Sequence, residues 1–69
     1  MIEVFKTNIE ESAKAEKVLG MLQSHFPGYN ITFDLEDCDR ILRVEGKGLK
    51  PEIIAEIVIS AGFDCRILE

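Results

Sequence analysis

Two cysteines and a group of turn carboxylates are the side chains of this 69-residue sequence with most scope for chemistry. Cys38 stands in the polar turn 36–39, and Cys65 follows Asp64 near the C-terminus. Carboxylates suit hard cations such as Ca²⁺ and Mg²⁺, whereas a thiolate suits softer metals. Because the two cysteines are far apart and no secretory signal precedes them, we expect free thiols rather than a disulfide.

The sequence offers no catalytic grouping. His25, the one histidine, falls at the end of a helical pattern, where it suits the negative end of the helix. No serine lies in a nucleophile-elbow pattern, and Gly46-Lys47-Gly48 is too short for a phosphate loop. We therefore expect a protein that is not an enzyme and uses no cofactor.

Charge and hydropathy limit the classes of partner and compartment. The formal net charge is −5, and no Lys/Arg cluster occurs, which argues against nucleic acid and anionic membrane as partners. A basic protein or a cation remains open. The apolar share of 46% indicates a folded domain, and no apolar run approaches the roughly 18 residues of a membrane span. We expect one domain over residues 1–69, soluble and cytoplasmic.

The elements that must position these residues follow from periodicity. Alternating or β-branched runs predict strands at 2–7, 31–35, 40–45 and 63–68. Helical spacing predicts a first helix between Asn8 and Phe26 and a second from Pro51 to Gly62, a left-handed stop. Asn8 and Glu11 match a capping box at the first helix, and Ser12 is an alternative cap.

The order βαββαβ predicts an α+β fold, the ferredoxin-like sandwich. Two β-α-β units give a four-stranded antiparallel sheet in the order 4-1-3-2, with both helices on one face. Strand direction then brings the connections 8–12, 36–39 and 61–65 to one end of the sheet. The carboxylates gathered there, called the acidic end below, are Glu10, Glu11, Glu36, Asp37, Asp39 and Asp64.

The acidic end has two interpretations. One is a cation site, since Cys38 and Cys65 also fall there. The other is a solvated or partner-facing surface, which is the more common role of loop carboxylates. Lys14, Arg40 and Arg66 offset part of the charge.

The open face, which is the sheet face away from the helices, is a second candidate surface. One residue of each pair Val4-Phe5, Ile41-Leu42 and Ile67-Leu68 should lie on it and form an apolar strip for a partner or a homodimer.

The sequence resembles the heavy-metal-associated domains, the βαββαβ modules of copper chaperones and metal-transporting ATPase tails. The resemblance spans nearly the whole chain. The matching segments are Phe5-Lys6-Thr7-Asn8-Ile9, Val44-Glu45-Gly46, Ile54-Ala55-Glu56-Ile57 and Ala61-Gly62-Phe63-Asp64.

The family's metal loop carries Cys-x-x-Cys, whose thiolates bind the metal. Here the matching positions are Glu11 and Lys14, or Glu10 and Ala13 if the register slips by one. Neither register holds a cysteine, so the family's ligands do not transfer, and a Glu/Lys pair should form a salt link. The resemblance is therefore to a degenerate member that keeps the scaffold and lacks the site.

These observations favour a non-catalytic binding or interaction module that contacts a protein, or a second copy of itself, through the acidic end or the open face. The alternative is a metal carrier that uses Cys38 with nearby carboxylates, the remaining ligand candidates being Glu10, Glu11 and Cys65. In that alternative Cys65 is the weaker thiol, because alternation with Phe63 and Ile67 points it toward the core. A small-molecule sensor would require dimerisation.

Overall fold

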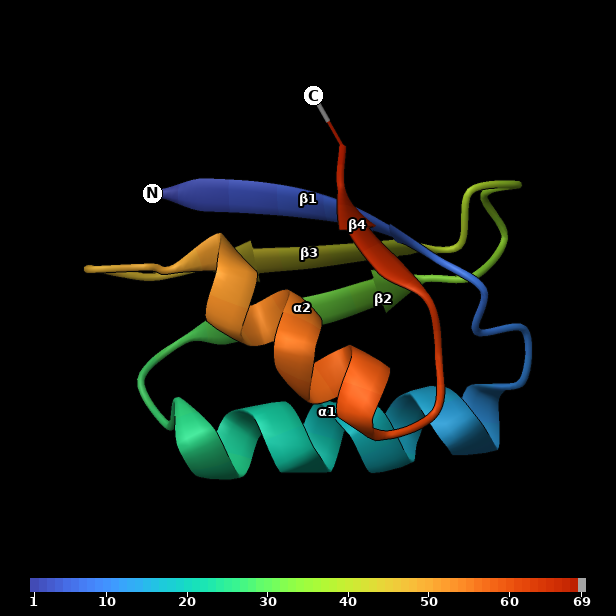
Figure 1. Cartoon of the computed structure of the whole chain (residues 1–69), viewed down its shortest axis with the longest axis horizontal. Helices are drawn as coiled ribbons and strands as arrows, with labels where there is room; N and C mark the ends of the chain where they lie inside the picture. Colours follow the sequence, from blue (N-terminus) through green and yellow to red (C-terminus); the bar gives the residue numbers. More distant parts are fainter. Residues whose placement is uncertain (69) are drawn as a thin grey trace.

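The computed structural model describes residues 1–68 and has the predicted element order (Figure 1). The elements are β1 (Ile2–Thr7), α1 (Ser12–His25), β2 (Asn30–Asp34), β3 (Ile41–Glu45), α2 (Pro51–Ser60) and β4 (Cys65–Ile67). The sheet order is β2-β3-β1-β4, which is the predicted 4-1-3-2 in reverse. Over residues 1–68, no helix combines the length and the apolar character that crossing a membrane requires.

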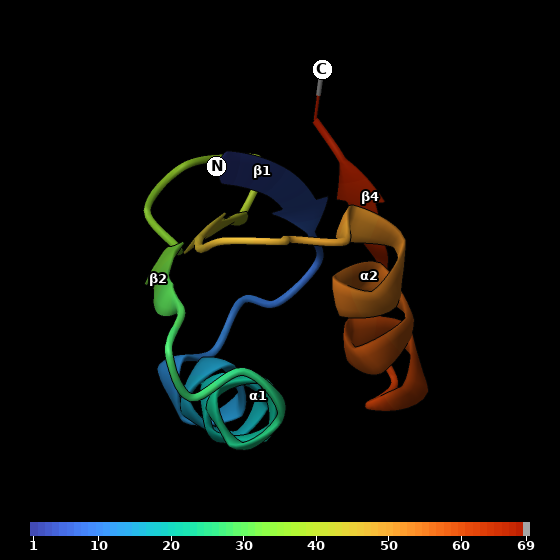
Figure 2. The same ribbon diagram turned by 90° about the vertical axis from the view of Figure 1, so that its left-hand side faces the viewer.

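The sheet is antiparallel, and both helices cover the same face of it (Figures 1 and 2). β1 lies in the interior, where Phe5 is opposite Leu42 of β3 and Ile67 of β4. Phe5 and Leu42 are fully buried and pack with Val18 and Leu22 of α1. From α2 the core receives Ile54 and Val58.

The predicted capping box at α1 is wrong. The helix begins at Ser12 after Glu11, and no side chain caps it. Asn8 lies three residues before Glu11, and its side chain is hydrogen bonded to Asp64 instead. Ser12 is the first residue of the helix and not its cap.

The second helix follows the sequence signals closely. Pro51 occupies the first helical position, where its missing N–H costs nothing. Gly62 has a φ of 100°, which a side chain would disfavour, and it ends the helix as predicted. β4 is shorter than the predicted 63–68, because the Phe63 N–H still bonds to the Val58 carbonyl at 3.4 Å.

The open face carries more charge than the predicted apolar strip implied. Val4 and Ile41 lie on it, since their neighbours Phe5 and Leu42 point into the core. Ile41 is only 6% exposed, and Leu68 is 41% exposed. The exposed cations Lys6, Arg43 and Arg66 lie on the same face.

The end of the molecule opposite the acidic end is fixed by an aromatic pair. Phe26 and Tyr29 stack with their ring centroids 4.9 Å apart, and the Tyr29 hydroxyl donates to the Lys47 carbonyl at 2.9 Å. The Tyr29 ring occupies the space beside Gly46, where an added Cβ would lie 2.3 Å from it. A glycine is therefore required at position 46 for the ring to pack.

Candidate functional site

The three connections predicted to meet do so, and a buried threonine joins two of them. Thr7 ends β1 and is 5% exposed. Its Oγ1 donates to the Arg40 carbonyl at 2.6 Å and accepts from the Ile9 N–H at 3.2 Å. The Thr7 N–H donates to the same Arg40 carbonyl at 3.2 Å. The buried side chain of Thr7 thus links the β1–α1 connection to the β2–β3 connection.

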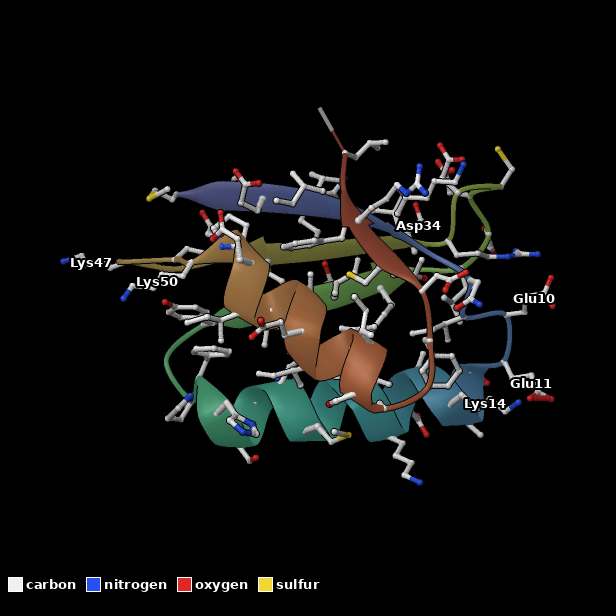
Figure 3. The ribbon with its side chains drawn as sticks, viewed as in Figure 1. Glu10, Glu11, Lys14, Asp34, Lys47 and Lys50 are labelled. Atoms are coloured by element: carbon white, nitrogen blue, oxygen red, sulfur yellow. The ribbon has the colours of Figure 1, made fainter. Side chains whose placement is uncertain are left out.

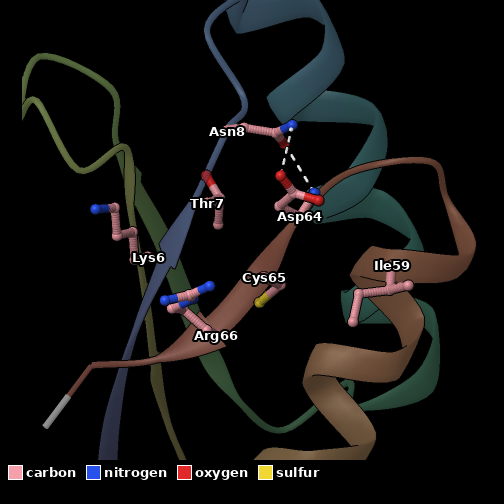
Figure 4. A pocket seen from close by; sticks show the side chains of 7 residues that line it. All are labelled: Lys6, Thr7, Asn8, Ile59, Asp64, Cys65 and Arg66. Carbon is pink, nitrogen blue, oxygen red and sulfur yellow. Dashed lines mark hydrogen bonds between the residues drawn. The ribbon is translucent and has the colours of Figure 1, made fainter.

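The third connection is held by Asn8. Its Oδ1 accepts from the Asp64 N–H at 2.9 Å, and its Nδ2 lies 3.4 Å from Asp64 Oδ2 (Figure 4). These bonds join residues 56 positions apart. Asn8, which the sequence predicted to cap α1, therefore links the β1–α1 loop to Asp64, the residue before β4.

Arg40 organises the turn after β2. Its backbone has a φ of 48°, uncommon for a side-chain-bearing residue, and its N–H bonds to the Asp37 carbonyl at 3.0 Å. Its guanidinium donates to the Leu35 carbonyl and, at 3.4 Å, to Glu10. One arginine thus joins the turn and the β1–α1 loop, a role that no sequence signal indicated.

Most carboxylates of the acidic end have partners. Lys14 Nζ lies 2.9 Å from Glu11 Oε2, which is the salt link expected from the sequence, and Lys6 Nζ lies 3.4 Å from Asp39 Oδ1. Figure 3 shows Glu10, Glu11 and Lys14 together at this end of the molecule. Both pairs are exposed, so each contributes little to stability.

The two cysteines differ in environment, and both are free. Cys65 is buried as predicted and faces the core, and desolvation raises the pKa of its thiol to about 11. Cys38 is exposed. Cys65 is therefore a neutral, apolar-like side chain at physiological pH and a poor ligand or nucleophile.

One group of potential metal ligands occurs within residues 1–68. The ligand atoms of Asp37, Cys38 and Asp39 all lie within 4.8 Å of one another. Glu10, Glu11 and Cys65, the other ligand candidates from the sequence, are not members of the group. Asp37 Oδ1 accepts from the Asp39 N–H at 2.9 Å, so part of this arrangement serves the turn itself.

A depression of about 480 Å³ lies between the end of β1 and the start of β4 (Figure 4). Its polar lining comes from Lys6, Thr7, Asn8, Asp64 and Arg66, and Cys65 and Ile59 also border it. The bonded pair Asn8–Asp64 forms one wall. The thiol that borders the depression is held in its neutral form by burial, and no histidine is among the residues that line it.

Similarity to known proteins is found among solved structures and not among sequences. No family model matches the sequence, and no curated protein sequence matches it. Among solved structures, a gold-binding protein superposes with a TM-score of 0.83 at 22% identity, covering 96% of this chain and 98% of the other.

Two further solved structures are similar. One is the yeast copper transporter domain CCC2A, solved in apo and Cu(I)-loaded states, with a TM-score of 0.74, 19% identity and coverage of 99% and 94%. The other is the N-terminal domain of PacS from Synechocystis PCC6803, which superposes with a TM-score of 0.74 at 16% identity. The match covers 100% of this chain and 98% of the other. Identities this low show the fold alone. The chain therefore has the fold of the heavy-metal-associated domains, as its sequence resemblance predicted.

Proposed function

We propose that this chain is a non-catalytic protein-binding module that uses the heavy-metal-associated fold without the two-thiol metal site. The observation that carries the proposal is the 2.9 Å ion pair between Glu11 and Lys14, one of the two pairs of positions that match the family's cysteines. The other pair, Glu10 and Ala13, also offers no thiol. A carboxylate and an ammonium do not provide the soft ligands that Cu(I) requires. The residues present therefore do not fit the metal that the fold family suggests.

The acidic end supports a protein partner rather than a small ligand. Its carboxylates project from three connections that are tied together by Thr7, Asn8 and Arg40, so the surface is held in a fixed shape. A preorganised charged surface lowers the entropy lost on binding. Because the chain carries a net charge of −5, a basic partner is favoured over an acidic one.

The proposal is tested by titrating the reduced protein with Cu(I) in competition with a chelator. We expect the wild type to bind no stoichiometric Cu(I). The matched control is the double variant Glu11→Cys and Lys14→Cys, which restores the family's spacing and should bind one Cu(I). Stoichiometric binding to the wild type, tighter than micromolar, would overturn the proposal.

A metal carrier is the second candidate, and the clustering of Asp37, Cys38 and Asp39 favours it. Such a site would have one thiolate and two carboxylates, which suits Zn²⁺ better than Cu(I). If this candidate holds, Cys38→Ser abolishes Zn²⁺ binding measured by calorimetry, whereas Cys65→Ser leaves it intact. Equal binding by wild type and Cys38→Ser would rule it out.

A further inference from the structure

β2 is an edge strand whose outer side is free. The Thr7 N–H bonds to Arg40 and the Gly46 N–H bonds to Met1, so the even-numbered residues of β3 bond to β1. By antiparallel alternation the odd-numbered residues of β3 bond to β2, where their partners are Asn30, Thr32 and Asp34.

The remaining β2 residues, Ile31 and Phe33, therefore direct their backbone N–H and C=O groups away from the sheet. No loop within the described chain supplies a backbone hydrogen bond to Ile31 or Phe33. Unpaired groups of this kind are a template for an additional strand.

An apolar groove runs beside this free edge. It has a volume of about 370 Å³ and lies between α1 and β2, which Figure 2 shows next to each other on one side of the molecule. Its apolar walls are Ala15 and Leu19 from α1, and Ile31, Phe33 and Leu35 from β2 and the residue after it. A strand added to β2 would place alternate side chains in this groove, since neighbouring strand residues point to opposite faces.

The charges around the groove define the partner. Glu16 lines the groove itself, and Asp34, at the end of β2 and opposite Ile41, lies on the open-face side of the same edge (Figure 3). No lysine or arginine is among the lining residues; the nearby Lys14 and Lys17 line a separate groove on the other side of α1. Charge complementarity therefore favours basic side chains in the occupant.

We propose that the free edge of β2 and the groove beside α1 are a docking site for an extended basic segment of a partner protein, which adds to the sheet as a fifth strand. The inference rests on the proposed function and adds to the acidic end a second surface on which a basic partner can dock. A second copy of this chain is a poorer occupant, because its own β2 edge carries Asp34 and no lysine or arginine, and so offers no basic side chain to this site.

The test uses a synthetic peptide, Thr-Lys-Val-Arg-Val-Lys-Thr with blocked ends, titrated into ¹⁵N-labelled protein. We expect the amide signals of Ile31 and Phe33 to shift most and their hydrogen exchange to slow, because their N–H groups gain partners. The same peptide with N-methylated valines, which cannot complete the ladder, should produce no such shifts. Replacing its basic residues with glutamate should weaken binding and reverse its salt dependence, because salt then screens a repulsion between like charges.

Two protein variants, Leu19→Lys and Glu16→Lys, test the groove, and Ile59→Lys is their control. Leu19→Lys removes an apolar wall of the groove and adds a positive charge that repels the basic peptide. It should lower the affinity for the peptide by about tenfold or more. Ile59→Lys makes the same change at an exposed position of α2 and should bind as the wild type does. Glu16→Lys alters only an exposed side chain, so folding is retained, and it should also weaken binding.

The outcomes separate this inference from the proposed function. Shifts confined to residues 37–39 and 64 would overturn the inference and leave the acidic end as the docking surface. A self-association that protects Ile31 and Phe33 would make a second copy the occupant, which also overturns it. No shift at millimolar peptide overturns it as well, whereas the proposed function fails separately if the wild type binds Cu(I).

Discussion

Cys65 shows how burial suppresses the reactivity of a single side chain. It lies opposite Thr7 in the β1–β4 pair and faces the core, where burial raises the pKa of the thiol to about 11. The thiol is therefore protonated at neutral pH and contributes packing rather than reactivity. Its position followed from strand alternation in the sequence, and its raised pKa follows from its burial.

The raised pKa has a consequence for stability at high pH. In the unfolded chain the thiol ionises near its ordinary pKa of 9.0, while the folded protein holds the proton until about pH 11. Between these values the unfolded state binds fewer protons, so stability falls as the pH rises, by at most about 2–3 kcal/mol. Below pH 9 the contribution is fully present, and above pH 11 the curve levels.

Urea unfolding of the wild type and of Cys65→Ala from pH 8 to pH 11 checks this. The variant should lose some packing energy at every pH but lack the additional fall, because the two proteins differ only in the side chain at position 65. Parallel curves across this pH range would contradict the prediction.

At the scale of the elements, the sequence predicted which segments form strands and helices but not how their ends are tied. The helical spacing of the first helix and the stop at Gly62 are local signals, and both were confirmed. Asn8 also carried a local signal, yet its side chain bonds to Asp64, 56 residues away. A long-range partner replaced the cap, and nothing near Asn8 in the sequence indicates such a partner.

Replacing Asn8 distinguishes the two roles. Asn8→Asp would preserve or improve a helix cap. In the observed arrangement Asn8 Nδ2 lies 3.4 Å from Asp64 Oδ2, so the substitution places a second carboxylate beside that of Asp64. Because the two carboxylates repel each other, we expect the free energy of unfolding to fall by about 0.5–1 kcal/mol. The loss should shrink in high salt, because exposed charges are screened. Urea unfolding at two salt concentrations measures this loss. A variant more stable than the wild type would instead support Asn8 as the cap of α1.

The candidate site was predictable only in part, for the same physical reason. The meeting of three connections followed from topology, and the Glu11–Lys14 pair followed from helical spacing. The contacts of Arg40 with Leu35 and Glu10, and of Lys6 with Asp39, depend on turn conformations that no periodicity encodes. The groove beside β2 requires knowledge of which strand lies at the edge and how far α1 stands from it.

At the scale of the whole molecule, a small core supports a rigid charged surface. A chain of this length has a total stability of only about 3–10 kcal/mol, so each core side chain carries a large share. Leu22 is fully buried between α1 and the sheet. Charge is also distributed unevenly, with Glu10 and Glu11 at one end and Lys47 and Lys50 at the other (Figure 3).

Truncating Leu22 tests the share of stability that the core supplies. Leu22→Ala should cost about 2–5 kcal/mol, since it removes buried methyl groups and leaves a cavity. Ile59→Ala, at a position 54% exposed, should change stability by less than about 0.5 kcal/mol. Thermal or urea unfolding compares the two, and similar costs for both variants would mean that the core does not lie where the structure places it.

The contrast between an exposed Cys38 and a buried Cys65 makes the native protein addressable at one position by thiol-directed probes. A maleimide dye or spin label added to the folded wild type should attach at Cys38, at the acidic end, without any engineered cysteine. Such a label lies outside the groove beside β2. It can therefore report distances to an arriving partner while leaving the proposed docking surface unmodified.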